Sequence, residues 1–418
     1  MKITFNGGAR EVGGSCIVVD TEDARVALDY GIKVDEGLSY TMPQDVDAVV
    51  VSHAHLDHSG NLLTLAEKEP VIIGSGVTHE ITMELLKDLI KIHRMKGKAL
   101  PYDVKDIHKL SDLWLTRTHV ALPGVEISLY PAGHVLGANM IHLKTKTKSL
   151  LYTGDFCTHN TEILDGADMS ALPKEPDVLV MESTYGGTTR PKRTELVKEL
   201  FGKIIETMDR EGNILIPSFA FHRIQEMARR IDTAMREQLL PRYNAYYISG
   251  LAHKITHYYN DYKSLLSKQV NQQPNPFQFT KIRRLYRTEQ IKEPAVVMCT
   301  SGFGHAGASR FLLYQWAGNE KDTIIINTGY LPPESPLNMA KEGKIVNNGE
   351  SIHVNADVEQ IELSGHADQE ELIDFVKTIN PKKTFLVHGN LDQAQALAEK
   401  IGRYTQVEIP TQNESFGI

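Results

Sequence analysis

The chain has 418 residues, of which 41% are hydrophobic and 23% are charged. This length exceeds that of one ordinary domain, and the composition excludes a disordered or fibrous chain. The formal net charge of −8 argues against a simple electrostatic binder of nucleic acid, unless bound metal ions and basic residues concentrate positive charge in one cleft.

The lengths of the apolar runs and the number of cysteines indicate the cellular compartment in which the protein is expected. No stretch reaches the roughly 18 consecutive apolar residues that a membrane helix needs, and the N-terminal MKITFNGG lacks the apolar core of a signal peptide. The three cysteines, Cys16, Cys157 and Cys299, are odd in number and far apart, which suits a reducing compartment rather than a disulfide framework. We therefore expect a cytoplasmic protein with no membrane partner.

The first part of the chain is typical of strands joined by short turns. One long amphipathic helix is predicted at residues 78–97, and a shorter helical run at 61–69. The predicted strands are residues 1–6, 16–20, 24–31, 47–52, 125–133, 140–145, 149–155 and 177–183.

From about residue 189 onwards, helical and strand patterns alternate, which indicates βαβ units and a parallel sheet. The predicted helices are residues 195–212, 222–238, 251–262 and 308–317, and the predicted strands are 213–218, 244–249, 294–301 and 322–329. One more strand–helix–strand unit follows at 352–364, 369–380 and 382–389. The site described next requires this last unit to meet the first part, so the middle segment is predicted to be an inserted domain.

The strongest chemical signal is the run His53-Ala54-His55-Leu56-Asp57-His58, which directly follows the predicted strand 47–52. Imidazole and carboxylate are the side chains that zinc prefers where thiolates are absent. Four such groups within six residues at a strand end allow one turn to supply two metal sites. A solvated, histidine-rich loop is the alternative.

One loop cannot complete two coordination shells, so further ligands are expected at other strand ends. His134 lies in PAGHVLGAN, where Gly133 and Gly137 leave room for close backbone approach, and Asp155 follows a strand in YTGDF. Alone, either would more often be an ordinary core or turn residue. Asp29, in ALDYG, is predicted to accept a hydrogen bond from a ligand histidine, with a turn-forming role as the alternative.

Two features of the middle segment are weaker signals. Ser301 and Arg310 flank the glycine-rich SGFGHAGASR and are candidates for a phosphate-binding nest or an oligomer contact. Basic residues also crowd two stretches, where phosphate contacts are one interpretation and a solvated helix face is the favoured one. The two stretches contain Lys87, Lys91, Arg94, Lys96 and Lys98, and Lys281, Arg283, Arg284 and Arg287.

These residues, in this order, resemble the metallo-β-lactamase superfamily, whose motifs are an Asp, HxHxDH, a His and an Asp. Later segments resemble its β-CASP branch, the nucleases of RNA processing and DNA repair. The matching residues are Glu182 in MESTYGG, His366 in LSGHADQEE and His388 in FLVHGN. The sequences around His366 and His388 are most similar to those of the nuclease subunit of the cleavage and polyadenylation specificity factor and its archaeal relatives.

The resemblance covers essentially the whole chain and implies an α/β fold. The expected architecture is an αββα metallo-β-lactamase sandwich with an inserted parallel-sheet β-CASP domain. Residues 1–189 and 349–418 are expected to form the two parts of the sandwich, and residues 190–348 the insertion.

The resemblance also implies a role for each site residue. His53, His55 and His134 would hold one zinc ion, Asp57, His58 and His388 a second, and Asp155 would bridge both. Asp57, Glu182 and His366 are the implied catalytic residues. His366 would give a proton to the leaving ribose oxygen while Glu182 orients it. The alternative for His366 is a structural histidine in a turn, and the alternative for Glu182 is a carboxylate at a helix N-terminus.

The implied activity is hydrolysis of phosphodiester bonds in single-stranded RNA, during RNA processing or decay. It would be endonucleolytic and, as in some relatives, also 5′→3′ exonucleolytic. His388 favours RNA, because the DNA-repair members tend to carry Val at that motif. The alternatives are a small-molecule hydrolase on the same two-zinc core, an inactive scaffold subunit of an RNA-processing complex, and a DNA nuclease. A homodimer and partners from an RNA-processing complex are expected by analogy.

Overall fold

The computed structural model describes residues 1–33, 43, 45–98, 100–327, 331–347 and 349–418. The chain divides into two compact units: Met1–Thr189 together with Gly365–Ile418, and Arg190–Ser364. The second unit thus continues past the expected end of the insertion, to Ser364. The reason is that β19 (Asp357–Gln360) pairs in parallel with β16 (Thr323–Ile326) of that unit's sheet.

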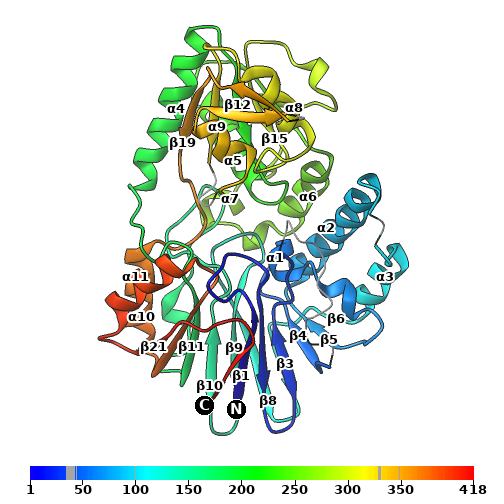
Figure 1. Ribbon diagram of the computed structural model, residues 1–418, viewed down its shortest axis with the longest axis vertical. Coiled ribbons are helices and arrows are strands. Elements are labelled where there is room, and N and C mark those ends of the chain that lie inside the picture. The colour runs from blue at the N-terminus through cyan, green and yellow to red at the C-terminus, as the bar shows by residue number, and fades with distance from the viewer. Residues whose placement is uncertain (34–42, 44, 99, 328–330, 348) are drawn as a thin grey trace. The chain divides into compact units, whose positions relative to one another are not determined.

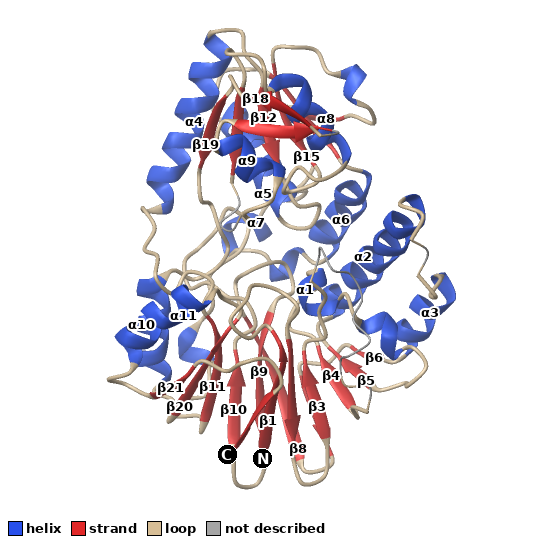
Figure 2. Ribbon diagram, in the orientation of Figure 1, coloured by secondary structure: helices blue, strands red, loops and turns tan. Residues whose placement is uncertain are grey.

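The first unit contains two sheets between helices (Figures 1 and 2). In spatial order, one sheet consists of β22 (Glu414–Gly417), β1 (Lys2–Gly7), β2 (Cys16–Asp20), β3 (Arg25–Leu28), β4 (Ala48–Val50), β5 (Val71–Ile73) and β6 (Trp114–Leu115). The other consists of β21 (Gln406–Glu408), β20 (Lys383–Val387), β11 (Val178–Glu182), β10 (Ser149–Tyr152), β9 (Asn139–Lys144), β8 (Val125–Pro131) and β7 (His119–Leu122).

The helices of the first unit cover the outer faces of these sheets, with α10 and α11 on one side and α2 and α3 on the other (Figure 1). They are α1 (Leu56–Ser59), α2 (Gly76–Met95), α3 (Val104–Asp112), α10 (Gln369–Ile379) and α11 (Leu391–Ile401), with 3-10 turns at Leu62–Leu65 and Met169–Ala171. In the part of the chain that the structure describes, no helix is long and apolar enough to cross a bilayer.

Alternating burial explains the layers. In β1, Ile3 and Phe5 are fully buried, and they join an apolar core that includes Val26 of one sheet and Val180 of the other. A second apolar cluster joins the outer face of the first sheet to α2 and α3, through residues such as Leu86. The unit is therefore a four-layer αββα sandwich.

The second unit contains one parallel sheet with helices on both faces. Its strands, in spatial order, are β14 (Ile282–Arg284), β13 (Asn244–Ile248), β15 (Ala295–Cys299), β12 (Ile214–Pro217), β16 and β19. Its helices are α4 (Arg193–Asp209), α5 (Arg223–Arg236), α6 (Gly250–Asp261), α7 (Lys268–Asn271), α8 (Gly307–Trp316) and α9 (Pro336–Lys341), with 3-10 turns at Lys263–Leu265 and Thr288–Gln290 and a hairpin of β17 (Lys344–Asn347) and β18 (Glu350–His353).

Three predicted elements differ from the structure. The helical run at 61–69 is only a 3-10 turn, because the chain turns at Glu69, whose φ of 51° lies in the left-handed region. The predicted strand 352–364 splits into β18 and β19. Finally, the basic stretch 281–287 is not a helix face, since it begins with the edge strand β14.

Candidate metal centre

The histidine-rich motif forms a tight turn that its neighbours hold from several sides. It follows β4 and enters the single-turn helix α1. Its carbonyl oxygens accept three backbone hydrogen bonds: Leu56 from Ile32 at 3.0 Å, Asp57 from Ser15 at 2.8 Å and His58 from Tyr30 at 2.7 Å. Gly31 lies so close that a Cβ there would come within 1.7 Å of the Asp57 carbonyl oxygen. The turn is therefore fixed by backbone contacts.

The other candidate residues come mostly from strand ends that meet at one edge of the second sheet. β10, β11 and β20 run parallel. Asp155 lies shortly after β10, Glu182 is the last residue of β11, and His388 directly follows β20. His134 lies in the turn between β8 and β9, and His366 shortly precedes α10. Parallel strands thus bring together side chains that lie far apart in the sequence.

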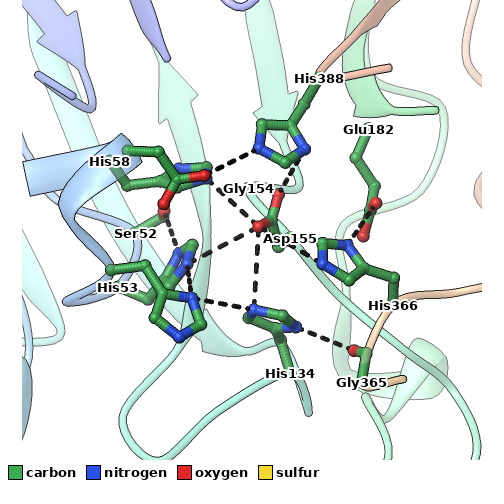
Figure 3. A network of polar contacts seen from close by, with 12 residues as sticks. Ser52, His53, His58, His134, Gly154, Asp155, Glu182, Gly365, His366 and His388 are labelled. Carbon is green, nitrogen blue, oxygen red and sulfur yellow. Dashed lines mark hydrogen bonds and ion pairs between the residues drawn. The ribbon is translucent and has the colours of Figure 1, made fainter. Parts of the chain in front are cut away.

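His53, His55 and His134 form a first group of ligand atoms (Figure 3 labels His53 and His134). His53 Nε2 and His134 Nε2 lie 3.0 and 3.3 Å from Nδ1 of His55. Two nitrogens bound to one tetrahedral zinc ion are separated by about 3.3 Å. His134 Nδ1 donates to the carbonyl oxygen of Gly365 at 2.9 Å, so its Nε2 lone pair points to the centre.

Asp57, His58 and His388 form a second group. Asp57 Oδ2 lies 3.3 Å from His388 Nε2 and 3.8 Å from His58 Nε2. His58 Nε2 is buried and has no hydrogen-bond partner among the described residues. A buried ring nitrogen in that position fits a metal ion.

Asp155 faces both groups (Figure 3). Its Oδ2 lies 3.2 Å from His58 Nε2 and 3.7 Å from both His53 Nε2 and His134 Nε2. Its Oδ1 lies 3.3 Å from His388 Nδ1. Both groups of candidate ligand atoms therefore lie close to this one carboxylate.

Asp29 is fully buried behind His58. It accepts hydrogen bonds from the amide and hydroxyl of Ser52 at 2.6 and 2.7 Å, and from the Tyr152 hydroxyl at 2.8 Å. His58 Nδ1 lies 2.7 Å from Asp29 Oδ2, which leaves Nε2 for the centre. Four contacts to one carboxylate orient the imidazole ring.

Glu182 and His366 lie at the side of the centre (Figure 3). His366 Nδ1 lies 2.7 Å from Glu182 Oε2, and its Nε2 lies 4.0 Å from Asp155 Oδ2. The other Glu182 oxygen accepts from the Phe156 amide at 2.8 Å. The His366 side chain is 19% exposed, whereas that of Glu182 is 1% exposed. The imidazole is therefore the member of the pair that a substrate can reach.

Electrostatics favour neutral imidazoles next to ionised carboxylates. Burial lowers the pKa of His55 to about 4 and holds the pKa of His53 and His134 well below the usual range. Burial raises the pKa of Asp155, but His388, His58 and His366 together hold it well below its ordinary value. Neutral imidazole and carboxylate are the protonation states that bind metal ions.

His58 differs from the other ligand histidines. Burial lowers its pKa, but the carboxylates of Asp155, Asp29 and Asp57 outweigh burial and raise its pKa well above the ordinary value. A cation at the centre would take over the role of this proton in balancing three carboxylates.

Sequence reasoning missed some residues of the site. Ser52 and Thr184 lie within two residues of predicted site residues in the sequence, so their positions could have indicated that they belong to the site. Tyr152 has no signal in one sequence, since it contacts Asp29 across 123 positions. Ser301 and Arg310 lie in the second unit, where the Ser301 hydroxyl accepts from the Ala306 amide and Arg310 lies over the Tyr314 ring.

Three family models match the chain. The metallo-beta-lactamase superfamily matches residues 9–189, the Beta-Casp domain matches 224–336, and the Zn-dependent metallo-hydrolase RNA specificity domain matches 351–410.

Several relatives are similar over most of the chain. "Transcription termination factor FttA" of Methanocaldococcus jannaschii is 33% identical over 96% of this chain and 69% of its own length. "Probable RNase MJ4" of the same organism is 31% identical over 95% of both chains. "Integrator complex subunit 11" of Danio rerio is 31% identical over 96% of this chain and 71% of its own.

Among solved structures, a protein of unknown function from Enterococcus faecalis V583 has the same fold. Its TM-score is 0.58 at 15% identity, over 99% of each chain.

Proposed function

The chain belongs to the β-CASP family of metallo-β-lactamase-fold hydrolases, and from this premise we propose that it is a zinc-dependent ribonuclease acting on single-stranded RNA. One observation carries the proposal: a partly exposed imidazole, His366, is held by Glu182 beside a cluster of histidines and aspartates that can bind metal. A relative named as a probable RNase and a match to an RNA specificity domain support RNA as the substrate.

The donor set suits two zinc ions. His53, His55 and His134 would hold one ion, Asp57, His58 and His388 the other, and Asp155 would contact both. All seven donors are imidazole or carboxylate, and the thiol nearest in sequence to any of them, Cys157, is buried and donates to the Gly133 carbonyl oxygen. When bound, zinc supplies Lewis-acid charge at the phosphate and lowers the pKa of the attacking water.

The chain's own groups complete the reaction. His366 Nε2 donates a proton to the leaving ribose oxygen, while Glu182 accepts a hydrogen bond from Nδ1 and favours the protonated ring. Asp57 has the most exposed carboxylate of the ligand set, at 24%, and can accept a hydrogen bond from the attacking water. Cleavage would be endonucleolytic and, from the 5′ end, also exonucleolytic.

The decisive experiment incubates the zinc-loaded protein with a 5′-labelled single-stranded RNA and with its DNA counterpart. We expect the wild type to cut the RNA and His55→Ala to cut neither, and the product ladder separates internal from terminal cleavage. A wild type that holds two zinc ions and cuts neither nucleic acid would instead favour a small-molecule hydrolase.

Three further properties belong to the proposal. The protein would act in the cytoplasm, form a homodimer and work with RNA-processing partners. The Integrator relative supports a complex, since its name states that it is a subunit of one.

A further inference from the structure

The second unit carries a group of aromatic and basic side chains that the proposed catalysis does not use. We call this group the stacking cluster: Tyr247, His253, His257, Arg284 and Tyr286. Tyr247 of β13 and Arg284 of β14 are register partners in a parallel pair, so their side chains lie on the same face of the sheet. His253 and His257 lie one turn apart on α6, and Tyr286 follows Arg284 by two residues.

Direct contacts join these residues in two groups, which adjoin where Tyr247 and Arg284 pair across the strands. The Arg284 guanidinium carbon lies 4.4 Å from the centre of the Tyr286 ring. The Tyr247 hydroxyl lies 3.0 Å from His253 Nδ1, and the rings of His253 and His257 are 5.1 Å apart. The pKa of His253 is lowered by burial first and then by Arg284 and His257, which places both residues within electrostatic range of His253.

The cluster is open to a ligand. Tyr286 is 72% exposed although it is a large aromatic residue. Arg284 covers one face of its ring, which leaves the opposite face free. Arg284 Nε is buried and has no hydrogen-bond partner among the described residues. The cluster therefore offers an exposed aromatic ring next to a guanidinium group.

The local charge is also unusual for this chain. Residues 281–287 contain four cationic side chains and no carboxylate, although the net charge of the chain is −8. In the described part of the chain, none of the four forms a salt bridge. They are Lys281, Arg283, Arg284 and Arg287. Cations without carboxylate partners, on and beside an edge strand, attract a polyanion.

We propose that the stacking cluster is a nucleotide-binding subsite for single-stranded RNA. One base stacks on the free face of Tyr286, and Arg284 and His257 contact adjoining phosphates. Single-strand binding proteins combine cationic grooves with aromatic platforms in this way, because every base offers a π-face whatever its sequence. The inference rests on the proposed function, which makes RNA the substrate, and it adds a place where RNA is held.

The test measures binding by fluorescence anisotropy in the full-length, zinc-loaded chain with His366→Ala as the background, which should hold zinc without cleaving. The probes are a labelled RNA of about twenty nucleotides and an abasic ribose-phosphate oligomer of the same length. Tyr286→Leu should weaken RNA binding at least about fivefold and leave the abasic oligomer unchanged. Tyr286→Phe, which keeps the ring, should bind RNA like the parent.

Each variant has a matched control in the same unit. Phe311→Leu removes another exposed aromatic ring, and Arg242→Gln removes another exposed charge. Arg284→Gln should weaken both probes and reduce the salt dependence of binding by about 0.7 in the log–log slope, the value for one phosphate on a single strand. Both control variants should bind like the parent.

The inference is overturned if Tyr286→Leu binds RNA as Phe311→Leu does, or if it weakens the abasic oligomer as much as the RNA. It is also overturned if Tyr286→Leu loses affinity only for vesicles of phosphatidylserine, which would indicate a membrane surface. Hydrolysis of bis(p-nitrophenyl) phosphate by the chain with native His366 is followed separately. Its absence would contradict the proposed hydrolase, whereas the binding result would still decide the subsite.

Discussion

At the scale of single residues, the centre depends on histidines whose two ring nitrogens have different partners. Nδ1 of His58 faces Asp29, Nδ1 of His134 faces the Gly365 carbonyl and Nδ1 of His53 faces the Ser52 hydroxyl. Each contact fixes the ring and leaves Nε2 directed to the centre. Asp29 and His388 have φ of 59° and 48°, a left-handed conformation that costs free energy in non-glycine residues.

Replacing Asp29 with Asn should weaken metal binding about 10- to 100-fold, because His58 loses its charged acceptor. Asn tolerates the positive φ, so the backbone should keep its conformation. Competition with a zinc chelator measures the affinity. Asp112→Asn, an exposed change on α3, is the control and should match the wild type. Equal affinity in both variants would contradict a role for Asp29.

His366→Ala should retain its zinc and lose about 10²- to 10⁴-fold in turnover, the usual contribution of a general acid. The proton donor is removed, whereas the seven proposed ligands stay in place. Metal analysis of the purified variant, followed by RNA cleavage rates, makes the distinction. Unchanged turnover would exclude His366 as the proton donor, and lost zinc would make it a structural residue.

The motif histidines and aspartates could be predicted from the sequence because metal chemistry restricts the residue types and places them at strand ends. The residues that orient them could not be predicted. Tyr152 contacts Asp29, and Thr184 donates to Glu182 at 2.6 Å, only after the sheets have assembled. A hydroxyl suits so many roles that its presence in a sequence indicates none of them.

At the scale of elements, a carboxylate connects the start of α10 to the loop that follows Asp155. Glu371 Oε1 accepts from the Thr158 amide and hydroxyl at 2.9 and 2.6 Å and from the His159 amide at 2.9 Å. Its Oε2 accepts from the Asp368 amide at 3.1 Å, which closes a capping box. The loop is thereby held beside the helix that follows His366.

This contact predicts a pH-dependent stability. Burial raises the pKa of Glu371, but hydrogen bonds and charge from His159 outweigh it and lower the pKa to about 2, from an ordinary value of 4.5. A lowered pKa stabilises the fold at pH above 4.5, and this contribution is lost as the pH falls towards about 2.

Glu371→Gln should therefore reduce the free energy of unfolding by up to about 3 kcal/mol at neutral pH. The difference from the wild type should narrow as the pH falls from 4.5 towards about 2, because the Glu371 carboxylate takes up a proton in the unfolded wild-type chain while it stays ionised in the folded one. Urea unfolding across this range tests the prediction, with Glu370→Gln as the control on the same helix. A difference that stays constant with pH would show that charge plays no part.

Elements with a strong hydrophobic periodicity were predicted well. Errors arose where contacts with distant segments of the chain decide which residues form a helix or a strand. The long helix was predicted at 78–97 and lies at Gly76–Met95, since the Ser75 side chain caps it at the Thr78 amide. By contrast, residues 352–364 have a continuous strand pattern, yet Asp357–Gln360 alone pairs with β16. Pairing partners decide such cases, and a single sequence does not contain them.

At the scale of the whole molecule, the second unit resembles a long insertion between two neighbouring points. The Gln369 amide donates to the Thr188 carbonyl at 3.0 Å, so the chain leaves and re-enters the first unit at almost the same place. An insertion with adjacent ends does not interrupt the sandwich core.

Replacing Arg190–Ser364 with a short Gly/Ser linker should leave a folded first unit that binds zinc. Affinity for RNA should fall, since the stacking cluster is removed, and hydrolysis of bis(p-nitrophenyl) phosphate should remain. Metal content, circular dichroism and anisotropy with labelled RNA provide the three measurements. A shortened chain that is unfolded at all zinc concentrations would contradict two separable domains.

His388 contacts Asp57 across 331 positions of sequence, and this separation has a consequence for biosynthesis. A ribosome must polymerise at least 388 residues before the centre can be completed. Every shorter nascent chain, including products of premature termination, lacks His388, a proposed ligand of the second group. If His388 is a ligand as proposed, a ribonuclease built in this order stays inert on the ribosome until residue 388 has been added, so a nascent chain cannot cut its own messenger RNA while the preceding codons are being read.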